Sequence, residues 1–299
     1  MGATAWQVGP DGGVAAGGAR VWQAGSGGDG AVGARVWRVN VDRPERPGWW
    51  HCLSAAEREK AAALAEPLAR RRYVAAHAAL RAVLGELCGV PAAQLAFGTD
   101  ASGRPCLRSS GGGSDFNLKG SGGGPDFNLE GSGEGPDFNL EGSGEGPDFN
   151  LSHSGEVPDF NLSHSGEWAL IAVAAPGGRV GVDVERVRDD FDHLEMARRM
   201  YQPEEAARVC AAGPGAGLAE YFRLWTAKEA YVKASGAGLA GLRDVLVRPE
   251  AGTCAESRGG SALSRSLPGS QVPVRWLDVA PGYAAALVTT ASTPAPRTG

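Results

Sequence analysis

Several features are scarce or missing in the 299-residue sequence. No apolar run approaches the ~18 residues of a membrane span, so we expect a soluble protein that does not cross a membrane. Its five cysteines are scattered and never form a Cys-x-x-Cys pair, which argues against a zinc site and a disulfide framework. A net charge of −5 gives no general attraction to nucleic acid. The start, MGATAWQVGP, lacks the pattern of a secretory signal, so we expect a cytoplasmic protein.

Glycine and proline, by contrast, are plentiful. The 46 glycines and 19 prolines indicate that much of the chain is not packed core. We expect the Gly/Ala-rich residues 1–33 and the tail at 291–299 to be disordered. An eleven-residue sequence is repeated five times in tandem over 114–168, and the fifth copy reads PDFNLSHSGEW. We interpret about 109–157 as a loop insertion built from these repeats, because lengthening a loop costs only ~0.6 kcal/mol per doubling.

Local patterns predict both helices and strands. Ser54 and Glu57 have capping-box spacing before a helix, and Pro67 opens a second helical run that stops at Gly89. Strands are expected at 35–42, 168–174, 179–187, 244–249, 273–279 and 282–289, and further helices at 193–201, 203–212 and 218–235. The turn PGG at 176–178 predicts that the second and third of these strands form a hairpin.

Two motifs carry groups suited to phosphoryl chemistry. In GVDVE, Asp183 and Glu185 alternate with valines, so their carboxylates share one face of a strand, roughly 7 Å apart. Glu229 and Lys233 are spaced by four on a predicted helix and are therefore neighbours. Each pair alone is most simply a solvated polar face. Together they offer three carboxylates and a lysine, a set suited to Mg²⁺, which also takes water and substrate phosphates as ligands.

The first half of the chain offers phosphate partners. Lys60, the cluster Arg70–Arg72, Arg81 and Arg104 are basic residues in an otherwise acidic protein, although any one of them alone is most simply surface charge. The hydroxyl and imidazole groups of NLSHSG, at 161–166, can donate hydrogen bonds to phosphate.

The order of these motifs resembles a known family. FNLSHSGEWALIAVA, then GVDVE, then WTAKEAYVK look like the 4′-phosphopantetheinyl transferases, specifically the large, surfactin-synthetase-activating type. Upstream, VDRPERPGWWHCLSAAEREKAAAL, RRRYVAAHAALRAVLG and SGRPCL are similar to the family's first half, so the resemblance covers roughly 35–108 and 158–290. It implies an α+β fold, a pseudodimer of two similar halves with the active site in the cleft between them. The halves would be 34–175, with the insertion, and 176–290, with the metal site.

The resemblance also implies a reaction. Such enzymes move the phosphopantetheine arm of coenzyme A to a serine of an acyl or peptidyl carrier protein and release 3′,5′-ADP. Asp183, Glu185 and Glu229 fall on the family's magnesium positions, and Glu229 also matches the general base. Lys233 matches the residue that stabilises or protonates the leaving phosphate, and His164 is expected to assist catalysis. The residues that match phosphate-binding positions are Lys60, Arg81, Arg104, Ser163 and His164. Glu57 stands where a relative has a lysine, which predicts a weakened or rerouted contact to the nucleotide.

Only the fifth copy of the repeated sequence directly precedes a predicted strand. We therefore expect His164 of that copy to act, rather than His153 of copy four, and copies one to three have no histidine. Two other functions remain open: a catalytically inactive homologue that binds carrier proteins, and a calcium-binding Gly/Asp repeat protein, against which the period of eleven argues. A monomer is expected because both halves are present in one chain. The sequence does not distinguish between carrier proteins, or between coenzyme A and acyl-coenzyme A.

Overall fold

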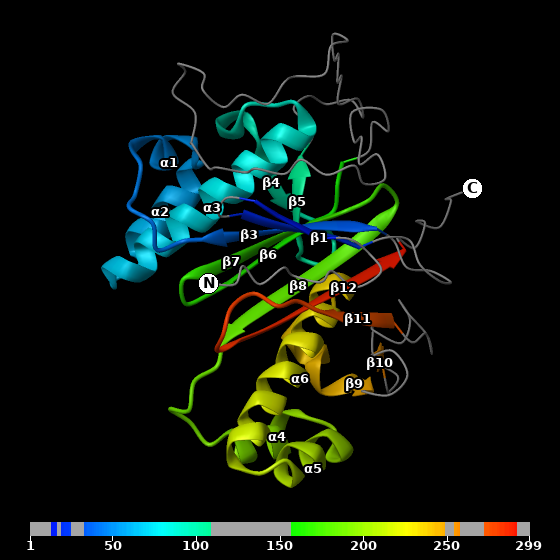
Figure 1. Cartoon of the computed structure of the whole chain (residues 1–299). Coiled ribbons are helices and arrows are strands. Elements are labelled where there is room, and N and C mark those ends of the chain that lie inside the picture. Colours follow the sequence, from blue (N-terminus) through cyan, green and yellow to red (C-terminus); the bar gives the residue numbers. More distant parts are fainter. Residues whose placement is uncertain are drawn as a thin grey trace, which may run out of the picture.

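The computed structural model describes residues 13–16, 19–24, 33–108, 157–248, 254–257 and 272–291. Within them, two five-stranded antiparallel sheets pack face to face, and helices cover their outer faces (Figure 1). Apart from Val157, the predicted insertion at 109–157 lies outside the described residues, as does the tail beyond Ala291. None of the described helices is both long enough and apolar enough to cross a membrane.

The first half combines three helices with a sheet of strand order β1-β2-β3-β7-β6. Its strands are β1 Gly13–Ala16, β2 Ala19–Ala24, β3 Ala34–Asn40, β6 Phe160–Ser165 and β7 Trp168–Ala174. Its helices are α1 Pro47–Cys52, α2 Ala55–Ala63 and α3 Pro67–Cys88, followed by the short 3₁₀ turn η1 Ala92–Gln94 and a hairpin of β4 Ala96–Thr99 and β5 Pro105–Arg108.

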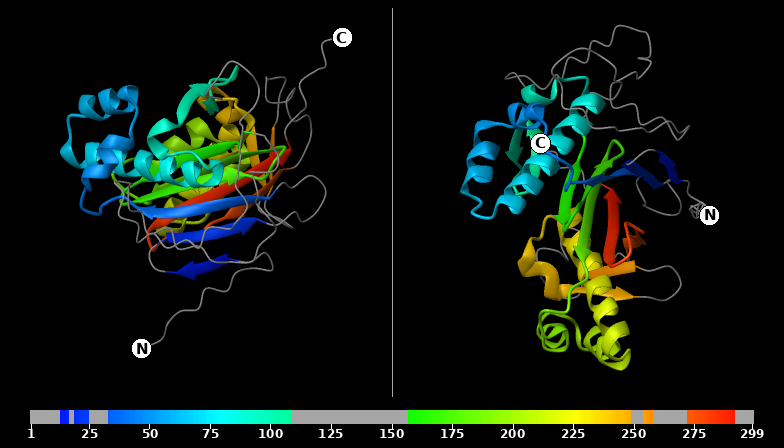
Figure 2. Two further views of the ribbon diagram at one scale, coloured as in Figure 1. Left: turned by 90° about the horizontal axis from the view of Figure 1, so that it is seen from above. Right: turned by 60° about the vertical axis from the view of Figure 1, so that its left-hand side comes forward.

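The second half repeats this plan with a sheet of order β8-β12-β11-β10-β9 (Figure 2). Its strands are β8 Gly178–Arg186, β9 Val245–Arg248, β10 Cys254–Ser257, β11 Val272–Trp276 and β12 Tyr283–Ala291. Its helices are α4 His193–Met200, α5 Pro203–Ala211, α6 Pro214–Ser235 and the 3₁₀ helix η3 Leu239–Asp244. The predicted α+β fold of two similar halves is therefore confirmed.

Strand β7 shows how the layers are held together. Its residues Leu170 and Ala172 pack with Val182 of the opposite sheet. Between them, Ile171 and Val173 face the other way and pack with the helices of the first half. Because both faces of this strand are buried, its sequence WALIAVA is an unbroken apolar run rather than an alternating one.

The predicted hairpin between 168–174 and 179–187 is wrong. Strand β7 pairs with β3 and β6, whereas β8 pairs with β12 in the other sheet. The turn between β7 and β8, with Gly177 at a φ of 72°, carries the chain from one sheet to the next. The hairpin partner of β7 is β6, a strand formed by the fifth copy of the repeated sequence.

Helix boundaries mostly follow the sequence signals. The capping box of α2 is present: Ser54 Oγ accepts from the Glu57 N–H at 3.3 Å, and Glu57 Oε2 accepts from the Ser54 N–H at 2.7 Å. Helix α3 ends at Gly89, whose φ is 65°. Helix α6 begins at Pro214, earlier than the predicted start at 218, because proline suits the first helical turn.

Two strands lie where disorder was expected. Strands β1 and β2 fall within residues 1–33, so the expectation is wrong for the residues of these two strands. Strand β2 contains the first occurrence of ARVW and pairs antiparallel with β3, which contains the second. This pairing gives β3 a neighbour on the side away from β7.

Candidate active site

Strands β6 and β8 lie side by side at the junction of the two halves, and side chains join them. Four side-chain oxygens accept from backbone N–H groups of β8: Asp159 from Val180 (2.7 Å), Asn161 from Val182 (2.9 Å), Ser163 from Val184 (3.4 Å) and Ser165 from Arg186 (3.1 Å). We call this set the β6–β8 ladder. The constant offset of 21 residues shows that the strands run parallel. The ladder satisfies donors at the edge of β8 that would otherwise be unpaired.

The predicted acidic pair lies on β8 beside this ladder. Ser163 Oγ lies 2.7 Å from Asp183 Oδ1, and Ser165 Oγ lies 2.8 Å from Glu185 Oε2. A hydroxyl can donate to a carboxylate, so each serine of the first half binds one acid of the second. The two halves therefore meet at the acidic pair.

Helix α6 brings Glu229 and Lys233 to the same place. Lys233 Nζ lies 2.6 Å from Asp183 Oδ1, and Glu229, one turn earlier, is only 8% exposed. The helix approaches β8 closely because Gly181 has no side chain: a Cβ there would lie 2.0 Å from the carbonyl oxygen of Ala230. Sequence reasoning missed Gly181, although a glycine inside a strand is a known sign of close backbone approach.

The three carboxylates form an acidic group in which Asp183 and Glu229 are buried and Glu185 is half-buried. Burial, with contributions from Asp183 and Glu185, raises the pKa of Glu229 to about 7, against the opposing effect of Lys233. Burial also raises the pKa of Asp183, and burial together with the Asp183 charge raises the pKa of Glu185. Asp183 is 3% exposed, and its Oδ2 has no hydrogen-bond partner among the described residues. A cation would stabilise this group.

The acidic group suits a metal that needs few protein ligands. Among the described residues, no three His, Cys, Asp or Glu side chains converge into a ready-made metal site. Mg²⁺, however, is commonly bound through one or two carboxylates together with waters and substrate phosphates. The unpartnered Oδ2 of Asp183 is a suitable ligand atom, and Glu185 and Glu229 lie near enough to interact electrostatically with Asp183. The residues present therefore fit Mg²⁺ as part of its shell.

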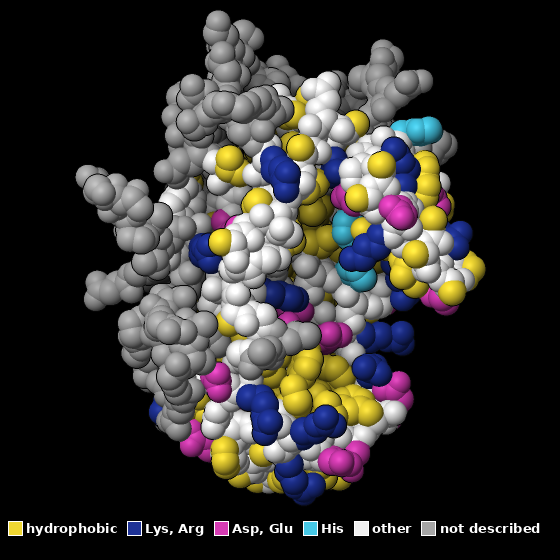
Figure 3. Space-filling model, turned by 180° about the vertical axis from the view of Figure 1, so that it is seen from behind, with side chains coloured by type: hydrophobic (Ala, Val, Ile, Leu, Met, Phe, Trp, Pro, Cys, Tyr) yellow, Lys and Arg dark blue, Asp and Glu magenta, His cyan; other side chains and the backbone are white. Residues whose placement is uncertain are grey.

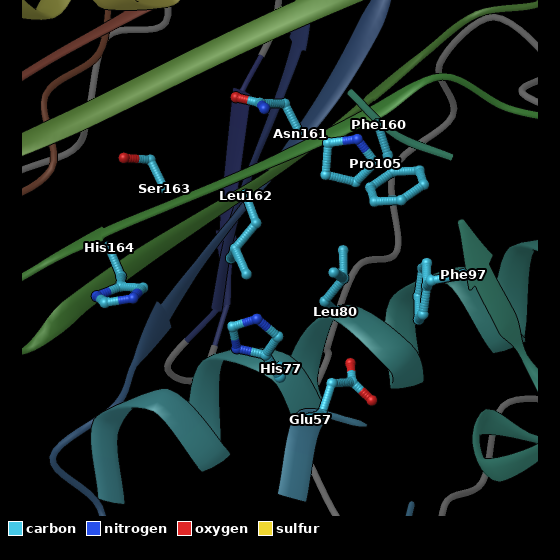
Figure 4. A pocket seen from close by; sticks show the side chains of 10 residues that line it. All are labelled: Glu57, His77, Leu80, Phe97, Pro105, Phe160, Asn161, Leu162, Ser163 and His164. Atoms are coloured by element: carbon cyan, nitrogen blue, oxygen red, sulfur yellow. The ribbon is translucent and has the colours of Figure 1, made fainter. Parts of the chain in front are cut away.

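A cavity of about 410 Å³ lies between β6, α3 and the β4–β5 hairpin (Figure 4). Its walls are Glu57, His77, Leu80, Phe97, Pro105, Phe160, Asn161, Leu162, Ser163 and His164. The rings of Phe97 and Phe160 meet edge to face at 5.5 Å and give it an aromatic wall. Burial lowers the pKa of His77 to about 4, so this imidazole is neutral at pH 7.

Cations surround His164 at one end of the cavity. His164 is exposed at the surface, but the surrounding protein removes part of the water around its ring, and this desolvation lowers the pKa of His164. The charges of Lys233, Arg72 and Lys60 lower it further. Arg72 also pairs with Asp42 at 2.7 Å. In Figure 3, histidine and basic side chains gather around the hollow between the upper and lower parts of the molecule. This concentration of positive charge favours an anion such as phosphate. The sequence had singled out Lys60 and Lys233, but Arg72 only as part of a cluster.

Arg81 points inward in this structure. It is fully buried, its Nε donates to Glu57 Oε2 at 2.8 Å, and its Nη1 donates to the carbonyl oxygens of Ala92 and Leu95 at 2.9 and 3.0 Å. Glu57, the residue that replaces a lysine of a relative, therefore has a structural partner. The phosphate contact expected of Arg81 stays a prediction, and it would require these bonds to be rearranged.

Arg104 also has a structural role, at the junction of the halves. Its Nη2 lies 2.8 Å from Asp159 Oδ2 and 3.0 Å from the carbonyl oxygen of Val180 on β8. It is 7% exposed and is not among the residues that line the cavity. Its expected phosphate contact likewise stays a prediction.

The chain is similar to known enzymes over most of its length. Over 216 residues, the chain is 29% identical to the 4′-phosphopantetheinyl transferase HetI of Nostoc sp., covering 71% of this chain and 72% of HetI. Residues 179–287, which contain β8 and α6, match the family described as the 4′-phosphopantetheinyl transferase superfamily. The chain is thus similar to 4′-phosphopantetheinyl transferases, through its second half in the family match and over most of its length in the comparison with HetI.

Two further relatives carry the same enzyme name. The 4′-phosphopantetheinyl transferase gsp of Aneurinibacillus migulanus is 34% identical over 73 residues, or 24% of this chain and 29% of that protein. A protein of Synechocystis sp. is named provisionally as such a transferase. It is 24% identical over 208 residues, which cover 69% of this chain and 66% of that protein. Homology to these transferases thus extends over most of the chain.

Proposed function

We propose that this chain transfers the 4′-phosphopantetheine arm of coenzyme A to a serine of an acyl or peptidyl carrier protein, releasing 3′,5′-ADP, with Mg²⁺ as cofactor. The proposal rests on the similarity to these transferases and on one observation: Ser163, from the first half, contacts Asp183 and Lys233, from the second. The active site would be a cleft between the two halves. Because one chain supplies both, the enzyme would act as a monomer.

The cavity beside β6 is suited to the nucleotide end of coenzyme A. Its volume of about 410 Å³ lies within the range of ligand pockets, and Phe97 and Phe160 offer an apolar wall to a flat ring. The phosphates would then lie near His164, where Lys60 and Arg72 add positive charge.

Glu229 is suited to act as general base. A carboxyl group with a pKa of about 7 is an effective base at neutral pH, because it is partly deprotonated yet still binds a proton well. It would accept the proton of the carrier serine as the serine oxygen forms a bond to the β-phosphorus of coenzyme A. The bond from that phosphorus to the bridging oxygen breaks, and the Lys233 ammonium stabilises or protonates the departing phosphate of 3′,5′-ADP. Mg²⁺ held by the carboxylates would neutralise charge on the pyrophosphate.

The test is an intact-mass measurement. An apo carrier protein is incubated with coenzyme A, Mg²⁺ and this protein, and we expect it to gain the mass of one phosphopantetheine arm. Glu229→Gln and Asp183→Ala should each abolish the gain while circular dichroism shows a folded chain. Glu195→Gln, which changes an exposed carboxylate on α4, is the matched control and should be fully active.

A folded wild-type protein that binds carrier but adds no mass would contradict the proposal and favour the inactive homologue. Carriers of fatty-acid, polyketide and nonribosomal-peptide type, compared in one assay, identify the substrate class. Replacing coenzyme A with acetyl-coenzyme A in the same assay tests whether the enzyme also accepts the acylated donor.

A further inference from the structure

Ser163 and Ser165 occupy equivalent positions two residues apart on β6. Each faces an acid on β8, and the acids, Asp183 and Glu185, are also two residues apart. Since β6 and β8 run parallel, the same contact is repeated along the strands. In Figure 4, Ser163 and Asn161 point away from the α3 side of β6, on which Leu162 lies.

The hydrogen-bonding capacity of Ser163 is fully used. A hydroxyl has one proton to donate and two lone pairs to accept with. The carboxylate oxygen Asp183 Oδ1, at 2.7 Å, can only accept, so the Ser163 hydroxyl donates its one hydrogen bond to this oxygen. The Val184 N–H and Lys233 Nζ, both at 3.4 Å, can only donate, so they donate to the two lone pairs of Ser163 Oγ. A phosphate oxygen can also only accept. It could bind the Ser163 hydroxyl only by replacing Asp183 as the acceptor of that hydrogen bond.

Ser165 is arranged in the same way. It donates to Glu185 Oε2 at 2.8 Å and accepts from the Arg186 N–H at 3.1 Å. Each serine is thus held by the backbone of β8 and in turn holds one carboxylate of β8. For Asp183, this leaves one oxygen anchored and Oδ2 without a partner among the described residues.

We propose that Ser163 and Ser165 are positioning residues, which fix the orientation of Asp183 and Glu185 so that their second oxygens can bind the metal ion. The inference rests on the proposed function, since it concerns the same metal site. Hydrogen bonds to metal-ligating carboxylates orient these ligands, and their loss typically weakens metal binding by about 10- to 100-fold. Ser163 would then serve the metal side of the site, and His164 the phosphate side.

Ser165 offers the cleaner test, because Ser163 also contacts Lys233 and lines the cavity. The probe is Mn²⁺, titrated into the full-length protein without coenzyme A and followed by electron paramagnetic resonance. Ser165→Ala should raise the Kd for Mn²⁺ by about tenfold. Ser165→Thr keeps the hydroxyl on a residue suited to a strand and should restore wild-type affinity.

Asn161→Ala is the matched control. It removes a ladder bond of the same kind, from the Val182 N–H at 2.9 Å, and Asn161 makes no hydrogen bond to a carboxylate among the described residues. Its place in the cavity wall does not affect this measurement, because the titration contains no coenzyme A. We expect it to lower the thermal midpoint about as much as Ser165→Ala does while leaving Mn²⁺ affinity unchanged. Equal loss of Mn²⁺ affinity in both variants would overturn the inference, because the ladder would then act through general stability.

The inference and the proposed function can fail separately. If wild type modifies carriers but Ser165→Ala binds Mn²⁺ as tightly as wild type, positioning is overturned and the transferase proposal stands. If no carrier gains mass but Ser165→Ala weakens Mn²⁺ binding and Ser165→Thr restores it, positioning is supported and the transferase proposal fails. Absence of Mn²⁺ binding by wild type overturns the inference.

Discussion

Gly181 on β8 packs directly against the backbone of Ala230 on α6. A Cβ atom at Gly181 would lie 2.0 Å from the Ala230 carbonyl oxygen and 2.5 Å from the backbone nitrogen of Ala234. This close approach places Lys233 beside Asp183. The absence of one side chain therefore determines how far the helix lies from the acidic strand.

Gly181→Ala should destabilise the protein and abolish transfer, because the added methyl group pushes α6 away from β8. Overpacking of this kind costs about 1–3 kcal/mol, which urea unfolding can measure. Gly215→Ala is the control: it lies in the first turn of the same helix with nothing within 4 Å, and it should be neutral or stabilising by up to ~1 kcal/mol. Wild-type stability and activity in Gly181→Ala would show that the helix tolerates a larger separation.

Glu229 should make the folded state less stable as pH rises. Its pKa is raised from 4.5 to about 7, so the folded state binds this proton more tightly than the unfolded state does. Stability from this group is present below pH 4.5 and is lost as pH rises through about 7. In EDTA at pH 8, Glu229→Gln should therefore be more stable than wild type, by on the order of 2 kcal/mol.

Thermal unfolding from pH 4 to 8 measures this difference, which should be largest at the alkaline end. Equal pH dependence in Glu229→Gln and wild type would contradict the raised pKa. Asp183 and Glu185 also have raised pKa values and add to the dependence in the same direction, so the variant should retain part of it.

The ion pair of Lys228 and Glu205 joins α6 to α5 in the interior of the second half. Both side chains are 0% exposed, and Nζ lies 2.7 Å from Oε2. Glu205→Ala should cost about 3–5 kcal/mol in urea unfolding, because it leaves a buried ammonium without its counter-charge. Adding Lys228→Met should recover part of this loss. A double variant no more stable than Glu205→Ala would show that the unpaired charge is not the cause.

Local signals in the sequence predicted the local structure well. The capping box of α2 and the glycine that ends α3 depend on residues within a turn of one another, and both are present. Whether the turn at 176–178 returns the chain to the same sheet depends instead on which distant strands bury the two apolar faces. The pattern around the turn does not contain that information, and the hairpin prediction was wrong.

The site shows the same division between local and distant information. The carboxylates Asp183 and Glu185 could be placed on one face of a strand from their alternation alone. That Arg81 turns inward could not be foreseen, because its partner Glu57 lies 24 residues earlier on another helix. The ladder, likewise, joins two strands across 21 residues. Contacts of this kind depend on how elements that are distant in the chain pack together, which local sequence patterns do not reveal.

The fifth copy of the repeat forms β6, and four earlier copies precede it. Deleting 114–157 should therefore preserve folding and transfer. Arg104 already contacts Asp159, and β5 extends only about 13 Å beyond Arg104. The remaining residues 109–113 and 158–159 can span this distance, since residues extend by up to ~3.3 Å each. An unfolded or inactive deletion variant, measured by circular dichroism and intact mass, would mean that the earlier copies are needed.

Copy four should be able to replace copy five if it is moved next to β7. In the full chain we expect His164→Ala to reduce transfer and His153→Ala to have no effect. Deleting 158–168 joins PDFNLSHSGEV directly to Ala169, which puts His153 in the position of His164. Some stability should be lost, because valine replaces Trp168, whose ring lies 4.2 Å from the Arg38 guanidinium carbon. In this shortened chain His153→Ala should become the damaging change, and unchanged transfer would show that no histidine is required at this position of β6.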